Sequence, residues 1–353
     1  MEENIKMEEE YTYFTYDDYS IKFSDEFNEV FNDEIIDIMQ NVKKIEFGKN
    51  SLFNQPINNI PRNINILILG DQFNQPINNL PKELKVLKLG YEFNQPVDYL
   101  PRTMTELHFG HCFNKMVQFL PNSIQTLVFG QCFNHPLISV FADCKGNYSC
   151  LPNRLHTLVF GDDFNQHVNC EFSGHENGCT CSPKLPNTIS ILKFGQLFNK
   201  PIVKLPDELT SLEFGHCFNQ PLRFVLFNLR SLKFGHFFNQ TVRYLPESLE
   251  YLEFGADFNF PLDNLTKVKV LIFGVDFNQP LKKLPNTVHT IIFPKYSRFN
   301  HSIDYLPDSV VHLELGDHFK ETVKKIPFNL KKLVMSRKYR GILPQMNAVL
   351  SFE

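Results

Sequence analysis

The sequence predicts an all-β fold, an elongated parallel β-solenoid of about 14 coils with one short strand per coil. Two observations carry this prediction. The pair Phe-Asn recurs at a spacing of about 20 residues in most steps, and most copies are followed by one or two prolines and then by a short apolar run that ends at glycine. Units of this length are too short for private cores, so they must stack on one another. The pairs begin at Phe53, Phe73, Phe93, Phe113, Phe133, Phe164, Phe198, Phe218, Phe238, Phe258, Phe277 and Phe299.

Prolines define the first half of each unit. In the unit Phe93 to Cys112, FNQPVDYLPRTMTELHFGHC, the prolines are Pro96 and Pro101. A proline removes a backbone donor and clashes with the preceding helical turn, so this spacing argues against a helix. It also argues against a central strand, because proline cannot donate to a ladder. We therefore expect an irregular outer wall.

The second half of each unit predicts the strand. Leu87-Lys88-Leu89-Gly90 alternates apolar and polar residues and then stops at glycine, where we expect a turn that needs a permissive backbone. The outer wall provides the long return connection that parallel strands require. One strand per coil then stacks into a parallel sheet over a continuous column of phenylalanines.

The asparagine that follows each phenylalanine has a predicted structural role. Asn54, Asn74 and Asn94 would stack in successive coils as a ladder. An amide side chain both donates and accepts hydrogen bonds, so this ladder can satisfy turn backbone groups that no strand reaches.

The pattern F-N-x-P-[IL]-x-x-L-P at a period near 20 resembles the FNIP repeat family of social amoebae and giant viruses of amoebae, over about residues 27–335. The segment L-P-x-x-L-x-x-L-x-[LF] is similar to short leucine-rich repeats, although Asn94 lies two residues later than their consensus asparagine. The resemblance implies a leucine-rich-repeat-like protein-interaction scaffold. Some family members carry an amino-terminal F-box, which would imply a role as ubiquitin-ligase substrate adaptors, but the amino-terminal segment of this chain shows no clear F-box.

Composition divides the chain into three parts. Residues 1–18 are acidic and are expected to form a mobile tail, with aromatic residues that could fold back over the first coil. Residues 19–335 form the solenoid, with outer-wall insertions near 138–150 and 169–183. Residues 336–353 are expected to be a carboxy-terminal cap or tail. Within the first coil, Ile35, Ile36 and Met39 have the spacing of a short capping helix.

The insertions contain most of the cysteines. Five of the eight cysteines lie in residues 144–181, together with His175. Three interpretations stay open for this group: a zinc site, disulfide bonds, or surface loops that are rich in cysteine. The irregular spacing favours surface loops, so no metal or other cofactor is predicted. The five are Cys144, Cys150, Cys170, Cys179 and Cys181.

Net charge and hydropathy limit the classes of partner and the cellular locations that we expect. The formal net charge is −4, which argues against nucleic acid as the main partner. No apolar run approaches the ~18 residues of a transmembrane helix, and no secretory signal is visible. We expect a cytoplasmic protein, in the host cytoplasm if viral, without a membrane partner.

No catalytic motif is present, so the chain is predicted to be a non-enzymatic scaffold for an unknown protein partner, without a small-molecule substrate. The alternatives are a ubiquitin-ligase adaptor and a zinc-dependent enzyme at the two insertions. Binding is predicted at the solvent-facing strand position, where Lys193 to Glu253 alternate in sign and other coils carry paired apolar residues. The predicted binding residues are His108, Val128, Val159, Lys193, Glu213, Lys233, Glu253, Ile272 and Ile292.

Overall fold

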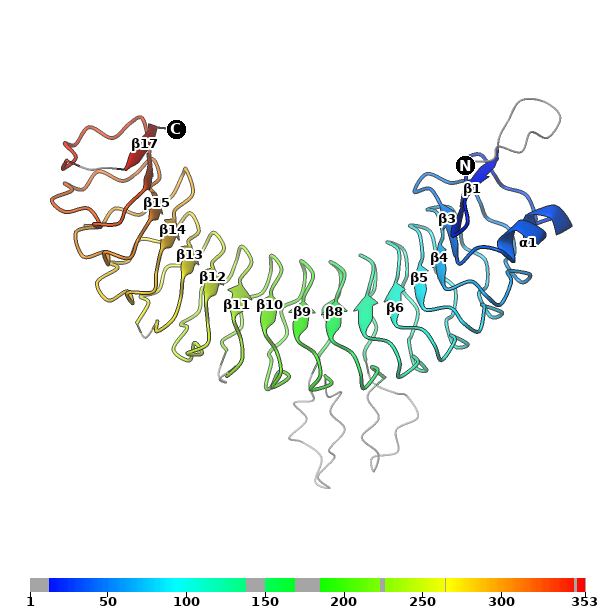
Figure 1. Cartoon of the computed structure of the whole chain (residues 1–353). Helices are drawn as coiled ribbons and strands as arrows, with labels where there is room; N and C mark the ends of the chain where they lie inside the picture. The colour runs from blue at the N-terminus through cyan, green and yellow to red at the C-terminus, as the bar shows by residue number, and fades with distance from the viewer. Residues whose placement is uncertain are drawn as a thin grey trace, which may run out of the picture. The chain divides into compact units, whose positions relative to one another are not determined.

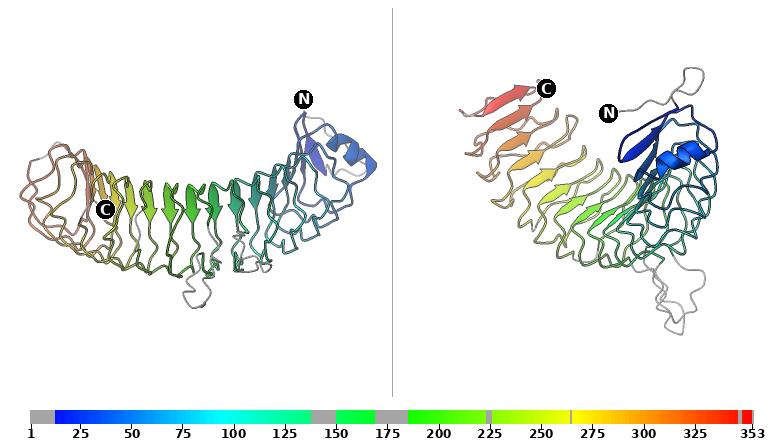
Figure 2. Two further views of the ribbon diagram at one scale, coloured as in Figure 1. Left: turned by 90° about the horizontal axis from the view of Figure 1, so that it is seen from below. Right: turned by 45° about the vertical axis from the view of Figure 1, so that its right-hand side comes forward.

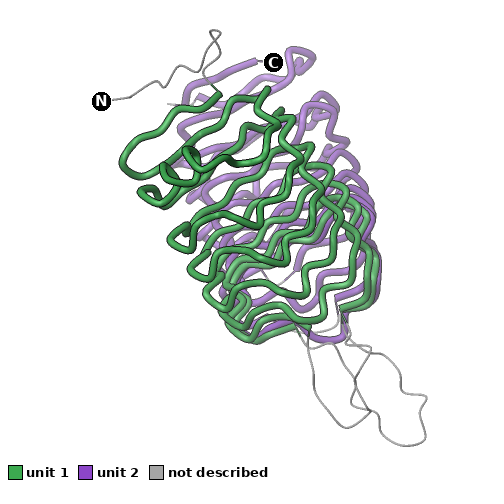
Figure 3. Tube along the Cα trace, turned by 90° about the vertical axis from the view of Figure 1, so that its right-hand side faces the viewer, with its two compact units in different colours: residues 1–189 green, residues 190–353 purple. Residues whose placement is uncertain are grey.

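The computed structural model is nearly all-β, a parallel β-solenoid of about 15 turns, which confirms the predicted fold class (Figure 1). It describes residues 13–137, 150–168, 185–222, 226–263, 265–345 and 348–352. The chain divides into two compact units, residues 1–189 (unit 1) and residues 190–353 (unit 2), coloured separately in Figure 3. Each unit is described by itself.

Unit 1 contains a short helix and a sheet in which the strands from β2 to β8 pair in parallel, each with the next along the chain. Only β1, among its described strands, pairs antiparallel, with β2. The elements are β1 (Phe14–Tyr16), β2 (Ser20–Phe23), α1 (Asp33–Met39), β3 (Lys44–Phe47), β4 (Ile66–Ile68), β5 (Val86–Lys88), β6 (Glu106–His108), β7 (Thr126–Val128) and β8 (Thr157–Val159).

Unit 2 repeats the arrangement, and its strands from β9 to β17 all pair in parallel with their sequence neighbours. Within each unit the strands lie side by side and irregular connections form the opposite wall (Figure 2). The strands are β9 (Ile191–Lys193), β10 (Ser211–Glu213), β11 (Ser231–Lys233), β12 (Tyr251–Glu253), β13 (Val270–Ile272), β14 (Thr290–Ile292), β15 (His312–Glu314), β16 (Lys332–Met335) and β17 (Val349–Phe352).

The start of the array differs from the sequence prediction. Residues 13–18 are not a mobile tail, because β1 adds to the edge of β2 and Phe14 packs against Phe23 with ring centroids 5.7 Å apart. The aromatic residues thus fold back over the first coil, whereas residues 1–12 lie outside the described residues. The short helix is present as α1, and the side chain of Asn32 caps it by accepting from the Ile35 amide at 2.9 Å.

The end of the array is a further coil. β17 continues the sheet beyond β16, and Tyr339 takes the place of the repeat phenylalanine and stacks on Phe319 at 5.8 Å. The segment 336–353, predicted to be a cap or tail, therefore contributes its own strand and its own ring to the stack. The departure from the repeat pattern in this segment concealed the coil in the sequence.

Stacked phenylalanines form the core of both units. The side chain of Phe93 is 0% exposed, and its ring lies 6.2 Å from that of Phe73 with an angle of 3° between the planes. A second column, which includes Phe109 and Phe129, packs beside the first, with Phe109 only 3.8 Å from Phe113. Aromatic pairs stabilise by ~0.5–1.5 kcal/mol beyond the area that they bury. The stack is therefore a repeated contribution to stability.

The predicted asparagine ladder is present. The backbone amide of Asn94 donates to Oδ1 of Asn74 at 3.0 Å, and the amide of Asn114 donates to Oδ1 of Asn94 at 3.0 Å. Gln95 strengthens the step, because its Nε2 donates to the same Oδ1 of Asn74 at 3.1 Å. The ladder ends where the backbone of Lys320 donates to Oδ1 of Asn300. The ladder side chains are half-buried or exposed, less shielded than the sequence suggested.

The repeat glycines are required by packing rather than by backbone conformation. The φ angles of repeat glycines such as Gly90, Gly110 and Gly235 lie outside the left-handed region, contrary to the expected permissive turn. A Cβ on Gly110 would lie closer than 3.0 Å to the carbonyl oxygen of Gly90, and the same clash recurs from coil to coil. Backbone therefore packs directly on backbone at this position.

Replacing one asparagine tests whether the ladder contributes to stability. Asn74→Ala removes the acceptor for the Asn94 amide and for Gln95 Nε2, and should lower the free energy of unfolding by about 1–2 kcal/mol. Asn78→Ala, an exposed position in the same coil, is the control and should be near neutral. Urea denaturation of both variants measures the difference, and equal losses would contradict a structural role for the ladder.

Adding one methyl group to a repeat glycine tests whether these glycines are required by packing between coils. Gly110→Ala forces a methyl group against backbone and should cost about 1–3 kcal/mol of stability. Gly48→Ala is the matched control, because its Cβ would meet the side chain of Asp25, which can move away. Thermal and urea unfolding should separate the two variants. A larger loss for the Gly48 variant would refute the packing explanation.

Candidate functional site

The exposed face of the sheet carries side chains that differ from one repeat to the next. In the three-residue strands from β4 to β15 the middle residue is buried, whereas the first and third residues are at least partly exposed. All nine predicted residues occupy the third position. In unit 1, His108, Val128 and Val159 are aligned on β6, β7 and β8. In unit 2 the remaining six are aligned on successive strands from β9 to β14.

Charged residues on the unit 2 face pair with one another. Lys193 Nζ lies 3.0 Å from Glu213, and Lys233 Nζ lies 3.2 Å from Glu253. The hydroxyl of Tyr251 donates to Glu253 at 2.5 Å, and burial followed by this hydrogen bond raises the pKa of Tyr251. The predicted alternation of charge is therefore a set of cross-strand pairs that hold the face in place.

An apolar patch follows these pairs along the sheet. Val270, Ile272, Thr290 and Ile292 lie half-buried on β13 and β14, and are called the β13–β14 patch below. Glu253 borders it on the β12 side. On the β15 side it is bordered by Glu314, which accepts from His312 at 2.7 Å and from Lys332 at 3.2 Å.

Unit 1 has a comparable arrangement. Glu106 lies 2.6 Å from His108 Nε2 and 3.4 Å from Lys88 Nζ. Burial lowers the pKa of His108 despite the opposing effect of Glu106, so this histidine is neutral at pH 7. The next two strands carry Thr126, Val128, Thr157 and Val159, all half-buried, which are called the β7–β8 patch.

The sequence prediction missed the first strand position on the same face. Val270 and Thr290 complete the β13–β14 patch, and Thr126 and Thr157 complete the β7–β8 patch. The alternation of side chains along a strand could have identified this position, because residues two apart in a strand lie on the same face of the sheet. The exposed face is therefore two side chains wide in each coil.

Cysteines and histidines outside this face form no site in the part of the chain described here, where no group of three potential metal ligands occurs. Cys150 is buried with a free thiol, and burial raises its pKa. Tyr91 and His111 stack on each other in successive turns at 4.2 Å, as do His216 and His236 at 4.6 Å. The other residues of the predicted cysteine group lie outside the described residues: Cys144, Cys170, His175, Cys179 and Cys181.

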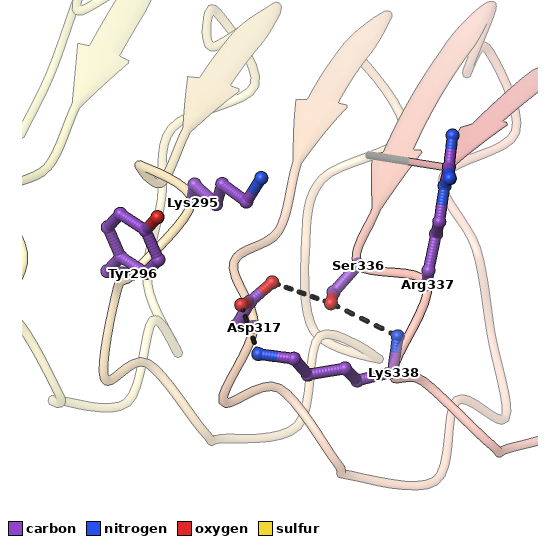
Figure 4. Close-up of a pocket in the computed structure, with 6 residues that line it drawn as sticks. All are labelled: Lys295, Tyr296, Asp317, Ser336, Arg337 and Lys338. Atoms are coloured by element: carbon purple, nitrogen blue, oxygen red, sulfur yellow. Dashed lines mark hydrogen bonds and ion pairs between the residues drawn. The ribbon is translucent and has the colours of Figure 1, made fainter.

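A cavity of about 680 Å³ lies between the last turns of unit 2 (Figure 4). Asp317, only 7% exposed, accepts from Ser336 Oγ at 2.6 Å and pairs with Lys338 Nζ at 2.6 Å. The hydrogen bond from Lys338, followed by that from Ser336, lowers the pKa of Asp317. Lys295 and Arg337 also line the cavity. The network joins consecutive turns and has a structural role.

The fold and the exposed sheet face define a repeat protein of the parallel β-solenoid class. The FNIP Repeat family matches six segments: residues 53–79, 77–112, 183–217, 198–237, 218–257 and 266–296. The chain therefore contains FNIP repeats, as the resemblance implied. No helix in the described part of the chain has the length and apolar character needed to span a membrane.

Solved structures that are similar to the chain include the following two. One is CroV588, a circular leucine-rich-repeat protein of a giant virus, at 28% identity and a TM-score of 0.47, over 96% of this chain and 67% of that one. The other is YopM from Yersinia enterocolitica WA-314, at 15% identity and a TM-score of 0.47, over 90% of this chain and 74% of that one. No curated protein matches the sequence significantly.

The Asp317 network makes stability depend on pH. Because the folded pKa of Asp317 is lowered, its contribution is present above the ordinary value of 3.8 and is lost as pH falls through the folded value. Asp317→Asn should therefore be less stable than wild type at pH 7, with the difference shrinking below pH 4. Urea denaturation across this range, with exposed Asp263→Asn as control, measures the effect. A difference that is independent of pH would contradict this assignment.

Proposed function

We propose that the chain is a non-enzymatic protein-interaction scaffold that binds its partner through the exposed sheet face. The observation that carries the proposal is the β13–β14 patch, where Ile272 and Ile292 stand half-buried and in register on an open face. The FNIP repeats support an interaction scaffold, because repeat solenoids bind partners through regular surfaces. The comparisons do not indicate which partner is bound.

The charge arrangement explains why the apolar residues should dominate binding. Lys193, Lys233 and Glu314 are already in ion pairs, and exposed pairs of this kind contribute only ~0.2–1 kcal/mol. The apolar side chains lose contact with water on binding and have no such internal partner. An apolar centre with a polar rim is the usual anatomy of a protein interface.

The β7–β8 patch offers the same chemistry in unit 1. Val128 and Val159 are aligned across adjacent strands, next to Glu106 and the neutral His108. We infer that each unit presents its own contact, with a hydrophobic centre and charged residues beside it. The adaptor and zinc-enzyme alternatives, and the cytoplasmic location, stay predictions.

Substitutions at the β13–β14 patch test the proposal. The double variant Ile272→Lys and Ile292→Lys should reduce affinity for the partner about 30-fold or more, because central interface residues contribute ~2 kcal/mol or more. Val203→Lys, an exposed apolar residue of unit 2 outside the strands, is the control. Affinity purification with quantitative mass spectrometry identifies partners that the control retains and the double variant loses.

Val128→Lys with Val159→Lys shows in the same assay whether unit 1 contributes. Circular dichroism establishes that each variant is folded. A set of captured proteins that is identical for wild type, both double variants and the control would refute binding through the sheet face.

A further inference from the structure

A groove on the outer wall of unit 1 has a charge pattern unlike that of the sheet face. It is a cavity of about 590 Å³ that spans three successive coils. Ile60, Leu80 and Leu100 line its base and are almost fully buried. This cavity, called the outer-wall groove below, lies on the side of the coil away from the strands.

Three cations line the groove at one repeat position. Arg62, Lys82 and Arg102 each follow the proline that ends the Leu-Pro or Ile-Pro step, so they stand in three adjacent coils. All three side chains are exposed, and the ion pairs of the described part of unit 1 involve Glu46 and Glu106 instead. Like charges on adjacent coils repel one another. An anion bound along the row would offset this repulsion.

An exposed aromatic residue stands beside the cations. Tyr99 is 72% exposed and borders both the groove and an adjoining cavity of about 840 Å³, which also contains Phe119, 62% exposed. Large aromatic residues expose this much surface at a cost, and together with arginine they are the residues that anchor protein interfaces. The groove thus combines an apolar anchor with three cations.

Unit 2 provides an internal comparison. Tyr244 and Tyr305 occupy the same repeat position as Tyr99, yet the position of the cations is taken by Glu247 and Asp308 in their coils. The aromatic residue is therefore a feature of several coils, whereas the basic row belongs to the outer-wall groove. The repeat fold therefore does not require the basic row.

We propose that the outer-wall groove binds an acidic peptide segment of a partner protein in an extended conformation. Carboxylates of the peptide pair with Arg62, Lys82 and Arg102, and an apolar side chain of the peptide packs on Tyr99. The planar guanidinium of each arginine can hold a carboxylate through two parallel hydrogen bonds. This binding surface is separate from the sheet face, so the proposal for the groove and the proposal for the sheet face can be refuted independently.

Nearby acids favour a peptide over a nucleic acid. Asp98 lines the adjoining cavity, Glu83 follows Lys82, and the whole chain has a formal charge of −4. A nucleic acid would bring a charge at every phosphate against these carboxylates, whereas a peptide can alternate acidic and apolar residues. The lower charge density suits a row of only three cations.

Fluorescence anisotropy with a labelled peptide of sequence EEFEELE tests the proposal on the full chain. Wild type should bind it saturably, and the triple variant R62A/K82A/R102A should bind it about 10-fold more weakly. Lys85→Ala, an exposed lysine in the same coil as Lys82, should leave the affinity unchanged. Tyr99→Ala should weaken binding several-fold, while Tyr244→Ala should not.

The outcomes that overturn the proposal are distinct. Absence of saturable binding by wild type, or equal affinity of wild type and the triple variant, would refute the site. Tighter binding of single-stranded oligo-dT than of the peptide, lost in the triple variant, would refute a peptide as the ligand. The sheet-face variants Ile272→Lys and Ile292→Lys serve as a further control, because they should not change the affinity for this peptide.

Discussion

The constraint on which the structure depends is that each coil must lie directly against a nearly identical one. Like side chains then stack on like: Phe73 on Phe93, the amide of Asn94 on the side chain of Asn74, and backbone on backbone at Gly90 and Gly110. Each of these contacts needs the coil to return to the same place after one repeat. The strands are parallel and in register as a consequence, because every coil starts the strand from an equivalent point.

The same constraint determines where sequence can vary. Side chains that point into the stack are confined to a few types, whereas the first and third strand residues and the outer wall face solvent. Charges on the sheet face are arranged so that adjacent strands attract, as Lys193 does with Glu213. The apolar patches and the basic row depart from this rule. They are the parts of the surface that stacking alone does not explain.

Much of this organisation could be predicted from the sequence, because the repeat period places every strand and therefore every cross-strand neighbour. The alignment of Ile272 with Ile292 follows directly from counting residues. The glycine requirement could not be predicted correctly, because the clash involves a backbone atom one coil away. The last coil was also missed, since Tyr339 replaces phenylalanine and only its stacking on Phe319 reveals the repeat. The outer-wall groove could not be found from the sequence either, because its cavity forms only where three coils stack and bring their apolar residues and cations together.

The asparagine ladder has a consequence for how such a protein can change in length. Within the ladder, a coil presents the same acceptor to its successor and the same donor to its predecessor, so the hydrogen bond between Asn74 and Asn94 is chemically the same as that between Asn94 and Asn114. Loss of residues 93–112 would bring Asn74 against Asn114 and restore an equivalent contact, and the phenylalanine rings would meet in the same way. Whole units are thus interchangeable parts. Gain or loss of one repeat alters the reach of the surface while the chemistry of each junction is preserved.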